Sequence, residues 1–130
     1  MTRKVVNCDQ APPALGAYSQ GVWAGDLLFL TGVCGADPKT GEIAAGGIGA
    51  ETKLAMETAG AMLASEGLSF DDVVNARIYI TDFDKFKEMN EVYKSFFNPP
   101  YPARATVEVS RLAGGAGVEI VLVAYRGKKP

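Results

Sequence analysis

Apolar residues along the chain follow the patterns of strands in six segments and of helices in two. Alternation with a period of two, or a short apolar run bounded by glycine and proline, is typical of a strand. Apolar positions that recur every three or four residues are typical of an amphipathic helix. These patterns predict strands at 5–6, 19–24, 26–35, 71–82, 103–111 and 118–126, with helices at 50–66 and 83–97.

Each predicted helix carries an apolar stripe and has signals at its ends. In the first helix the stripe comprises Leu54, Ala55, Thr58, Ala59, Met62 and Leu63. In the second it comprises Phe86, Met89, Tyr93, Phe96 and Phe97. Gly67 supplies a C-terminal stop for the first helix. Asp82 or Asp84 can cap the second, and the prolines at 99–100 prevent it from continuing.

The predicted order βββαβαββ indicates an α+β fold with one domain over 1–130, in which a single sheet has both helices packed on one face. Strand faces follow from the alternation. In 71–82 we expect one face to hold Val74, Ala76, Ile78 and Ile80, and the other to hold Asn75, Arg77 and Tyr79.

Strand 118–126 is apolar on both sides. One face holds Val118, Ile120, Leu122 and Ala124, and the other holds Val121 and Val123 beside Glu119 and Tyr125. Two helices on one face leave the other uncovered, and monomers rarely expose so large an apolar patch. This strand therefore predicts a homo-oligomer, although it does not set the symmetry.

Charge and composition exclude several functional classes. The 130 residues include 13 Lys and Arg against 15 Asp and Glu, with a formal net charge of −2 and a pI near 5.1. This balance provides no basic surface for binding nucleic acid. No apolar run approaches the ~20 residues that span a bilayer, and the N-terminus lacks the apolar segment of a secretory signal. We therefore expect a cytoplasmic protein that binds neither nucleic acid nor a membrane. Location in an organelle is the alternative, since a transit peptide can be removed.

The chain contains no histidine, and its two cysteines are Cys8 and Cys34. Ser-His and Cys-His nucleophilic systems are therefore excluded, together with the commonest transition-metal ligand. Two scattered cysteines are too few for a disulfide framework or a zinc site, so we expect free buried thiols. Any catalysis then depends on carboxylates, tyrosine, lysine, arginine, backbone groups or bound water.

Arg104 stands where the proline-rich segment 99–102 enters a predicted strand. A strand arginine is most often part of an ordinary ion pair, here with Glu108 or Glu119. Other polar residues at unusual positions are Glu119 on an apolar strand, Asn90 at core-like helical spacing, Tyr18 in a glycine-rich loop and Thr31 at a strand end. Each also has a purely structural interpretation. In the same order, these are a charge at a sheet edge, a side chain that tethers a loop, a packed aromatic ring and a residue that favours strands. The pattern alone does not show that they converge.

Six stretches of the sequence resemble the reactive intermediate deaminase (RidA/YjgF) family: "APPALGAYSQGV", "FLTG", "DPKTGE", "MNEVYKSFF", "YPARATVEVSRL" and "VEIVLVA". The resemblance implies a chorismate-mutase-like fold and a homotrimer with active sites in the clefts between subunits. It implies hydrolysis of reactive 2-imino acids, such as 2-iminobutanoate and 2-iminopropanoate, to 2-keto acids and ammonia. These imines are unstable products of pyridoxal-phosphate-dependent dehydratases, so the expected role is repair of metabolite damage. No metal or organic cofactor is needed.

The resemblance also assigns catalytic roles to three residues. Arg104 falls on the arginine that binds the substrate carboxylate, a role that suits a guanidinium fork better than a lysine. Glu119 falls on the glutamate that positions the attacking water and can move a proton to the departing ammonia. Tyr18 falls on the tyrosine of the family's motif.

Four further residues match substrate-binding positions of the family. Thr31 takes the place of a hydroxyl residue that is usually serine, and Gly32 permits close approach of the backbone. The backbone carbonyl that contacts the imine nitrogen would belong to Thr106, and Asn90 matches a helix asparagine that tethers the site.

The sequence departs from the family pattern beside these residues. After Thr31 and Gly32 it continues with Val33, Cys34 and Gly35, where glutamine and often proline are common. The departure affects the expected side-chain preference and rate. Two alternatives to imine hydrolysis stay open: a non-catalytic or chaperone-like trimer that binds small carboxylates, and an endoribonuclease, which the acidic pI and the absence of histidine disfavour.

Overall fold

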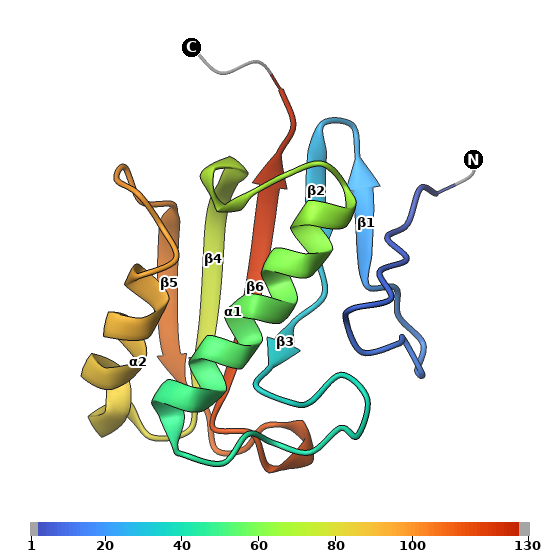
Figure 1. The fold of residues 1–130 in the computed structure, drawn as a ribbon. Coiled ribbons are helices and arrows are strands. Elements are labelled where there is room, and N and C mark those ends of the chain that lie inside the picture. The colour runs from blue at the N-terminus through green and yellow to red at the C-terminus, as the bar shows by residue number, and fades with distance from the viewer. Residues whose placement is uncertain (1–2, 128–130) are drawn as a thin grey trace.

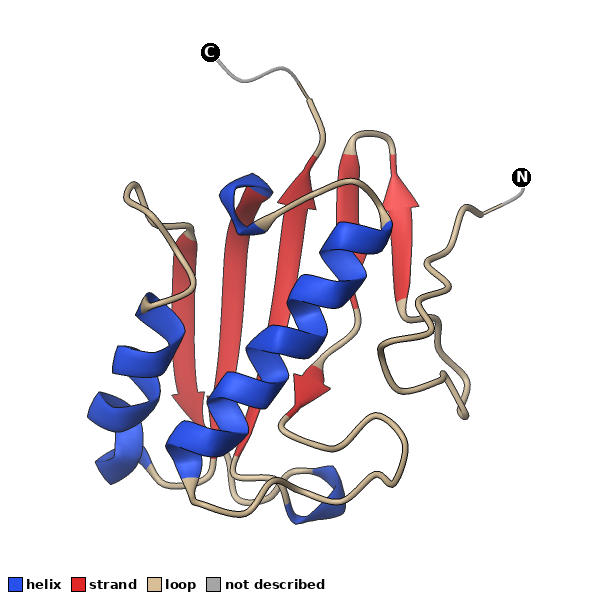
Figure 2. Ribbon diagram, in the orientation of Figure 1, coloured by secondary structure: helices blue, strands red, loops and turns tan. Residues whose placement is uncertain are grey.

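Six strands and two α-helices follow one another in the order βββαβαββ, as predicted, although the first three strands do not have the predicted bounds. The computed structural model describes residues 3–127, and both helices pack on the same face of one sheet (Figures 1 and 2). The elements are β1 (Gly21–Ala24), β2 (Leu27–Leu30), β3 (Val33–Cys34), α1 (Ile48–Ser65), β4 (Val73–Ile80), α2 (Phe86–Lys94), β5 (Ala103–Glu108) and β6 (Val118–Tyr125). The predicted α+β class with both helices on one face is confirmed.

The sheet has the order β1-β2-β6-β4-β5, and β3 pairs with β6 beyond the end of β2. β4 and β5 run parallel and are joined through α2, whereas the other pairs are antiparallel. β5 is therefore an edge strand, and β6 lies in the centre of the sheet (Figure 1). This topology places Arg104 on the edge strand and Glu119 on the central one.

The N-terminal strands differ from the prediction in two places. Segment 5–6 forms no strand, because Val5 makes only an isolated bridge with Val22. Segment 26–35 divides into β2 and β3 at Thr31 and Gly32. Phe29 pairs with Val123 and Val33 with Ile120, so four steps along this segment match three along β6. One extra residue interrupts a ladder in this way at a bulge.

The core lies between the helices and one face of the sheet. Its largest fully buried side chains include Leu28, Met56, Met62, Leu63, Ile78, Ile80, Met89, Ile120 and Leu122. The predicted stripes of both helices face the core except at Leu54, which is half-buried and is not among the side chains packed against the core. Phe86 and Phe96 are partly buried against it. Gly67 follows α1 with φ of 75°, as expected for a helix stop, and Asp82 caps the turn before α2 by accepting from the Asp84 N–H.

The expected inward orientation of Val74 is wrong. The pairing of β4 with β6 shifts register between Val73 and Asn75, so Val73 is buried and Val74 is 43% exposed. An extra residue of this kind reverses which side chains point toward the core before the irregularity, relative to those after it. From Ala76 onward the predicted alternation is confirmed.

The face of the sheet opposite the helices carries exposed apolar side chains. Phe29, Val107 and Tyr125 are 46%, 45% and 40% exposed, and Val121 and Val123 are half-buried. Nothing within residues 3–127 covers this face, since both helices lie on the other side (Figure 2). Neither helix in this part of the chain combines the length and apolarity needed to cross a membrane.

Candidate functional site

Arg104 is held against α2 by one amide and two aromatic rings. Its Nη1 donates to Asn90 Oδ1 at 2.6 Å, and its guanidinium carbon lies 4.9 Å from the ring centroid of Tyr93 and 5.5 Å from that of Phe86. Positions 86, 90 and 93 share one side of a helix. This side of α2 therefore forms a cradle that fixes the plane of the guanidinium.

The ion pair expected for Arg104 as one interpretation does not form. The Glu108 carboxylate instead accepts from the Phe83 N–H at 2.9 Å. The one salt bridge found within residues 3–127 joins Arg126 to Asp26 and does not involve Arg104. Asn90 occupies one of five N–H donors of the guanidinium, so the remaining donors of this exposed arginine can bind an anion.

The cavity beside Arg104 has a volume of about 370 Å³. It is lined by Asn90, Tyr93, Lys94, Tyr101, Pro102 and Arg104. Burial raises the pKa of Tyr93 to about 12, although Arg104 acts in the opposite direction. The Tyr93 hydroxyl and Thr106 Oγ1 are buried without a hydrogen-bond partner within residues 3–127. The cavity thus presents two cationic side chains, Arg104 and Lys94, beside the protonated phenol of Tyr93.

Glu119 belongs to a second cavity, of about 400 Å³, at the junction of β2, β3 and β6. Among its lining residues are Tyr18, Thr31, Gly32, Cys34 and Glu119. A Cβ on Gly32 would lie 2.8 Å from both Cδ and Oε2 of Glu119, so the absence of a side chain makes room for the carboxylate. Cys34 donates to Glu119 Oε1 with a sulfur–oxygen distance of 3.8 Å.

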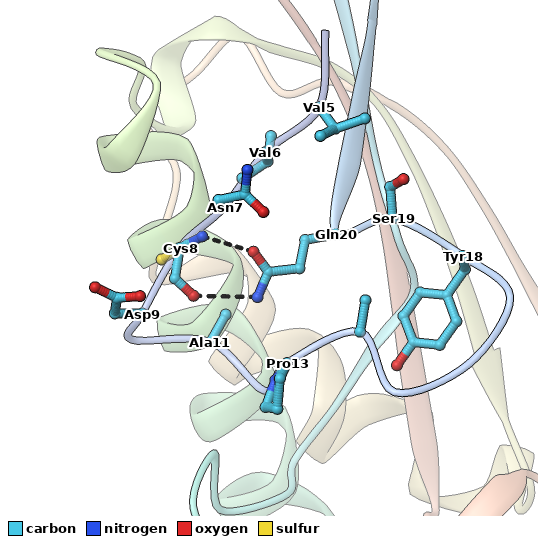
Figure 3. Close-up of a pocket in the computed structure, with 11 residues that line it drawn as sticks. Val5, Val6, Asn7, Cys8, Asp9, Ala11, Pro13, Tyr18, Ser19 and Gln20 are labelled. Atoms are coloured by element: carbon cyan, nitrogen blue, oxygen red, sulfur yellow. Dashed lines mark hydrogen bonds between the residues drawn. The ribbon is translucent and has the colours of Figure 1, made fainter. Parts of the chain in front are cut away.

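Tyr18 is carried by the loop between residues 8 and 20, which Gln20 fastens from inside. The Gln20 side chain accepts from the Cys8 N–H at 2.6 Å and donates to the carbonyls of Cys8 and Pro12 at 3.1 and 2.8 Å. Figure 3 shows these bonds to Cys8 and the Tyr18 ring on the outer turn of the same loop. Tyr18 is 53% exposed, while the loop that holds it is pinned.

The seven residues singled out from the sequence form two groups on opposite faces of the sheet. Arg104 and Thr106 pair with Ala76 and Ile78, which face the helices. Glu119 pairs with Tyr79, whose side chain points the other way. The helix-side group comprises Arg104, Thr106 and Asn90. The second group comprises Glu119, Gly32, Thr31 and Tyr18. One chain does not bring the two groups together.

Three residues at these sites were not identified as functional from the sequence. Phe86 and Tyr93 were assigned only to a core stripe, yet they flank Arg104. Their spacing of four and three residues around Asn90 is a signal that could have found them. Cys34 was noted only as a departure, and its contact with Glu119 depends on the pairing of β3 with β6.

Neither cysteine is in a disulfide, and neither belongs to a metal-binding cluster within residues 3–127. Cys8 is free and buried, as expected, whereas Cys34 is free but half-buried. Across residues 3–127, no group of three or more His, Cys, Asp or Glu is arranged to hold a metal ion. The charged and reactive groups that line the two cavities are a guanidinium, an ammonium, one carboxylate, hydroxyls and a thiol.

The sequence pattern of the family described as Endoribonuclease L-PSP matches residues 8–126. The chain belongs to this family, the YjgF/RidA family. Among its relatives, the RutC family protein PH0854 of Pyrococcus horikoshii is 41% identical, with 95% of this chain and 98% of the relative aligned. The 2-iminobutanoate/2-iminopropanoate deaminase of Bos taurus is 36% identical, with 98% and 93% aligned.

The YjgF/RidA fold is found in solved structures as well. The crystal structure of E. coli TdcF with bound serine superposes with a TM-score of 0.89 at 37% identity, covering 95% of this chain and 99% of that one. Similarity over nearly the full length of both chains confirms the family predicted from the six sequence motifs. Relatives at this level of identity carry different names, so the family alone does not fix one activity.

Proposed function

We propose that this protein hydrolyses reactive 2-imino acids, such as 2-iminobutanoate and 2-iminopropanoate, to 2-keto acids and ammonia. The observation that carries the proposal is the presentation of Arg104. Its guanidinium is fixed by Asn90 and two rings at the rim of a cavity and has no carboxylate partner within residues 3–127. A guanidinium held in this way matches a substrate carboxylate through two parallel hydrogen bonds.

Binding at Arg104 would orient the neighbouring imine carbon for attack by water. Glu119 takes a proton from the water as the oxygen adds to the C=N carbon and passes that proton to the nitrogen, and it moves the hydroxyl proton in the same way when the C–N bond breaks. Ammonia then leaves as the carbonyl forms, so one water is consumed for each 2-keto acid and ammonia released. The Thr106 carbonyl contacts the imine nitrogen, and Tyr18, Thr31 and Gly32 line the water side. No metal or organic cofactor takes part.

The complete site forms between subunits of a homotrimer. Arg104 and Glu119 lie on opposite faces of one sheet, so each chain contributes half of a site to each of two neighbours. The exposed Phe29 and Val107 on the helix-free face supply apolar surface for subunit contact. A closed ring of three copies with heterologous contacts completes three equivalent sites.

The comparisons support this reaction more than its alternatives. Relatives from several mammals at 35–37% identity are named 2-iminobutanoate/2-iminopropanoate deaminase, and a structural neighbour carries serine, a small molecule with a carboxylate. The endoribonuclease in the family's description is disfavoured for this chain by its net charge of −2 and lack of histidine. A trimer that binds small carboxylates without turnover is the remaining alternative.

Ammonia release from freshly generated 2-iminobutanoate, with and without the protein, tests the proposal. We expect ammonia to form faster than in buffer, in proportion to protein concentration. The alternatives are distinguished in the same experiment by two additional measurements, cleavage of a single-stranded RNA and binding of 2-oxobutanoate by calorimetry. Binding of the keto acid without acceleration of ammonia release would contradict the enzymatic role, and RNA cleavage alone would favour the nuclease.

A further inference from the structure

Cys34 lies beside the carboxylate of Glu119, on the strand that pairs with it. The register of β3 and β6 places the two residues opposite each other, and the thiol donates to Glu119 Oε1 at 3.8 Å. No other hydrogen bond to the Glu119 side chain is found within residues 3–127. Replacing Cys34 with a residue that has no side-chain donor, such as alanine, therefore removes the hydrogen bond that restrains this carboxylate.

The surroundings of Cys34 keep its thiol protonated. Burial, followed by the charge and hydrogen bond of Glu119 and then the charge of Glu51, raises the pKa of Cys34 to about 11. The other titratable groups near Glu119 are Tyr79, its partner on β4, and Tyr18, which lines the same cavity. At neutral pH the thiol is thus a hydrogen-bond donor and a poor nucleophile.

Glu119 is restrained on its other side and at the start of its strand. Oε2 lies over Gly32, where a Cβ would come within 2.8 Å. Glu51 of α1 accepts from the Gly117 N–H at 2.8 Å, two residues before Glu119, and so anchors the entry of β6. The carboxylate is consequently held between Gly32 and Cys34 at the wall of the cavity.

We propose that Cys34 is a positioning residue for Glu119: its thiol holds Oε1, so that Oε2 above Gly32 is presented to the water that attacks the imine. This inference rests on the proposed function. Because Arg104 binds the carboxylate of the substrate on the other half-site, the effect of Cys34 falls on turnover and leaves substrate binding unchanged.

A double-mutant cycle between positions 34 and 119 tests the coupling. Cys34→Ala is expected to lower kcat about fivefold, the effect of one lost hydrogen bond, with KM for the imine and the affinity for 2-oxobutanoate unchanged. Cys34→Ser retains a donor and should restore most of kcat. In the Glu119→Gln background, Cys34→Ala should cause no further loss. Cys8→Ala is the matched control, since it removes the other thiol away from Glu119.

Equal losses for Cys34→Ala in the two backgrounds, or no rescue by serine, would overturn the positioning role. The rate of alkylation by iodoacetamide tests the contact between Cys34 and Glu119 independently of enzyme activity, because only the thiolate form of cysteine reacts. Removing the carboxylate charge in Glu119→Gln should accelerate modification of Cys34 at least about threefold, with Cys8 in the same sample as the internal reference. An unchanged rate would overturn the contact itself.

Failure of the proposed function gives a different result. A protein that releases no ammonia from 2-iminobutanoate, yet shows faster alkylation of Cys34 in Glu119→Gln, would overturn imine hydrolysis and the positioning role together while leaving the hydrogen bond in place. A protein that hydrolyses the imine with additive effects at positions 34 and 119 would overturn only the role of Cys34.

Discussion

Arg104 and Glu119 lie on opposite faces of the same sheet. Arg104 is on edge strand β5 opposite Ala76, which faces the helices, and Glu119 is on central strand β6 opposite Tyr79, whose side chain points the other way. A carboxylate anchor and a base that act on one small substrate must lie within a few ångströms of it. If both act in one reaction, they come from two copies of the chain.

Mixed trimers provide a direct test of shared sites. Subunits with Arg104→Ala and subunits with Glu119→Gln are each expected to retain about a tenth of the wild-type activity or less when assembled alone. After refolding together in equal amounts, about one quarter of the sites should combine an intact Arg104 with an intact Glu119 from neighbouring subunits. Imine hydrolysis should recover to about that fraction of the wild-type rate. The control is sedimentation equilibrium, which should give three times the chain mass of 13.7 kDa for all mixtures. A trimer that gains no activity after mixing would place both residues in one subunit's site.

Substitution of Arg104 should weaken substrate binding and leave the fold intact. Arg104→Ala removes a charge-assisted contact worth ~1.5–3 kcal/mol, and Arg104→Lys lacks the second donor of the fork. We expect kcat/KM for 2-iminobutanoate to fall by about tenfold or more in both variants. Arg126→Ala is the matched control, because Arg126 also lies over an aromatic ring, that of Trp23 at 4.2 Å, on a different part of the sheet. Near-normal kcat/KM in Arg104→Ala would show that the carboxylate binds elsewhere.

Glu119→Gln should separate binding from turnover. The amide preserves the shape of the side chain but cannot accept a proton from water, so kcat should fall by ~10²-fold or more, as for a lost general base. Affinity for 2-oxobutanoate, measured by calorimetry, should change little because Arg104 is intact. Unchanged turnover by a folded trimer would eliminate the catalytic role and leave solvent as the unassisted nucleophile.

Two glycines close to the site should respond to alanine in opposite ways. The Cβ of Gly32→Ala meets the end of the Glu119 side chain, which can move aside, so stability should change by ~0.5 kcal/mol or less while turnover falls by about tenfold. The Cβ of Gly35→Ala meets the backbone of Glu51 on α1, which cannot move without shifting the helix. Urea denaturation should show a clear loss of stability for Gly35→Ala. Equal stability losses in both variants would contradict the role assigned to Gly32.

Alkaline pH should destabilise the protein through Cys34 and Tyr93. Burial is the main cause that raises the pKa of Cys34 from 9.0 to about 11 and that of Tyr93 from 10.0 to about 12. Between each pair of values the folded state binds more protons than the unfolded state, so the free energy of unfolding decreases as pH rises. Urea denaturation across pH 9–11 should show this decline, with a smaller slope for Cys34→Ala. Identical slopes in the wild-type protein and in Cys34→Ala would exclude Cys34 as a contributor.

Local patterns were sufficient to predict most of the fold and the identity of most candidate residues. The stop of α1 at Gly67 and the turn that Asp82 caps before α2 follow from local backbone preferences, which the chain carries in its sequence. The inward face of β6 follows from strict alternation of Ile120 and Leu122 with their neighbours. Arg104 was singled out by its place where a proline-rich segment enters a strand, and Glu119 as a carboxylate on an apolar strand, whereas their roles came from the resemblance to the RidA/YjgF family. Apart from those roles, all of these inferences need only residues that are close in sequence.

The sequence by itself determined the positions of the helices and of the strands that follow them, most of the core-facing stripes and the residue types available for chemistry. Tertiary structure alone decided the division of 26–35 into β2 and β3, the outward orientation of Val74, and the contact between Cys34 and Glu119. It also decided that Arg104 and Glu119 face opposite ways. The physical reason is that alternation fixes which residues of one strand share a face, whereas the register between strands, set by bulges and distant partners, fixes how the faces of different strands combine.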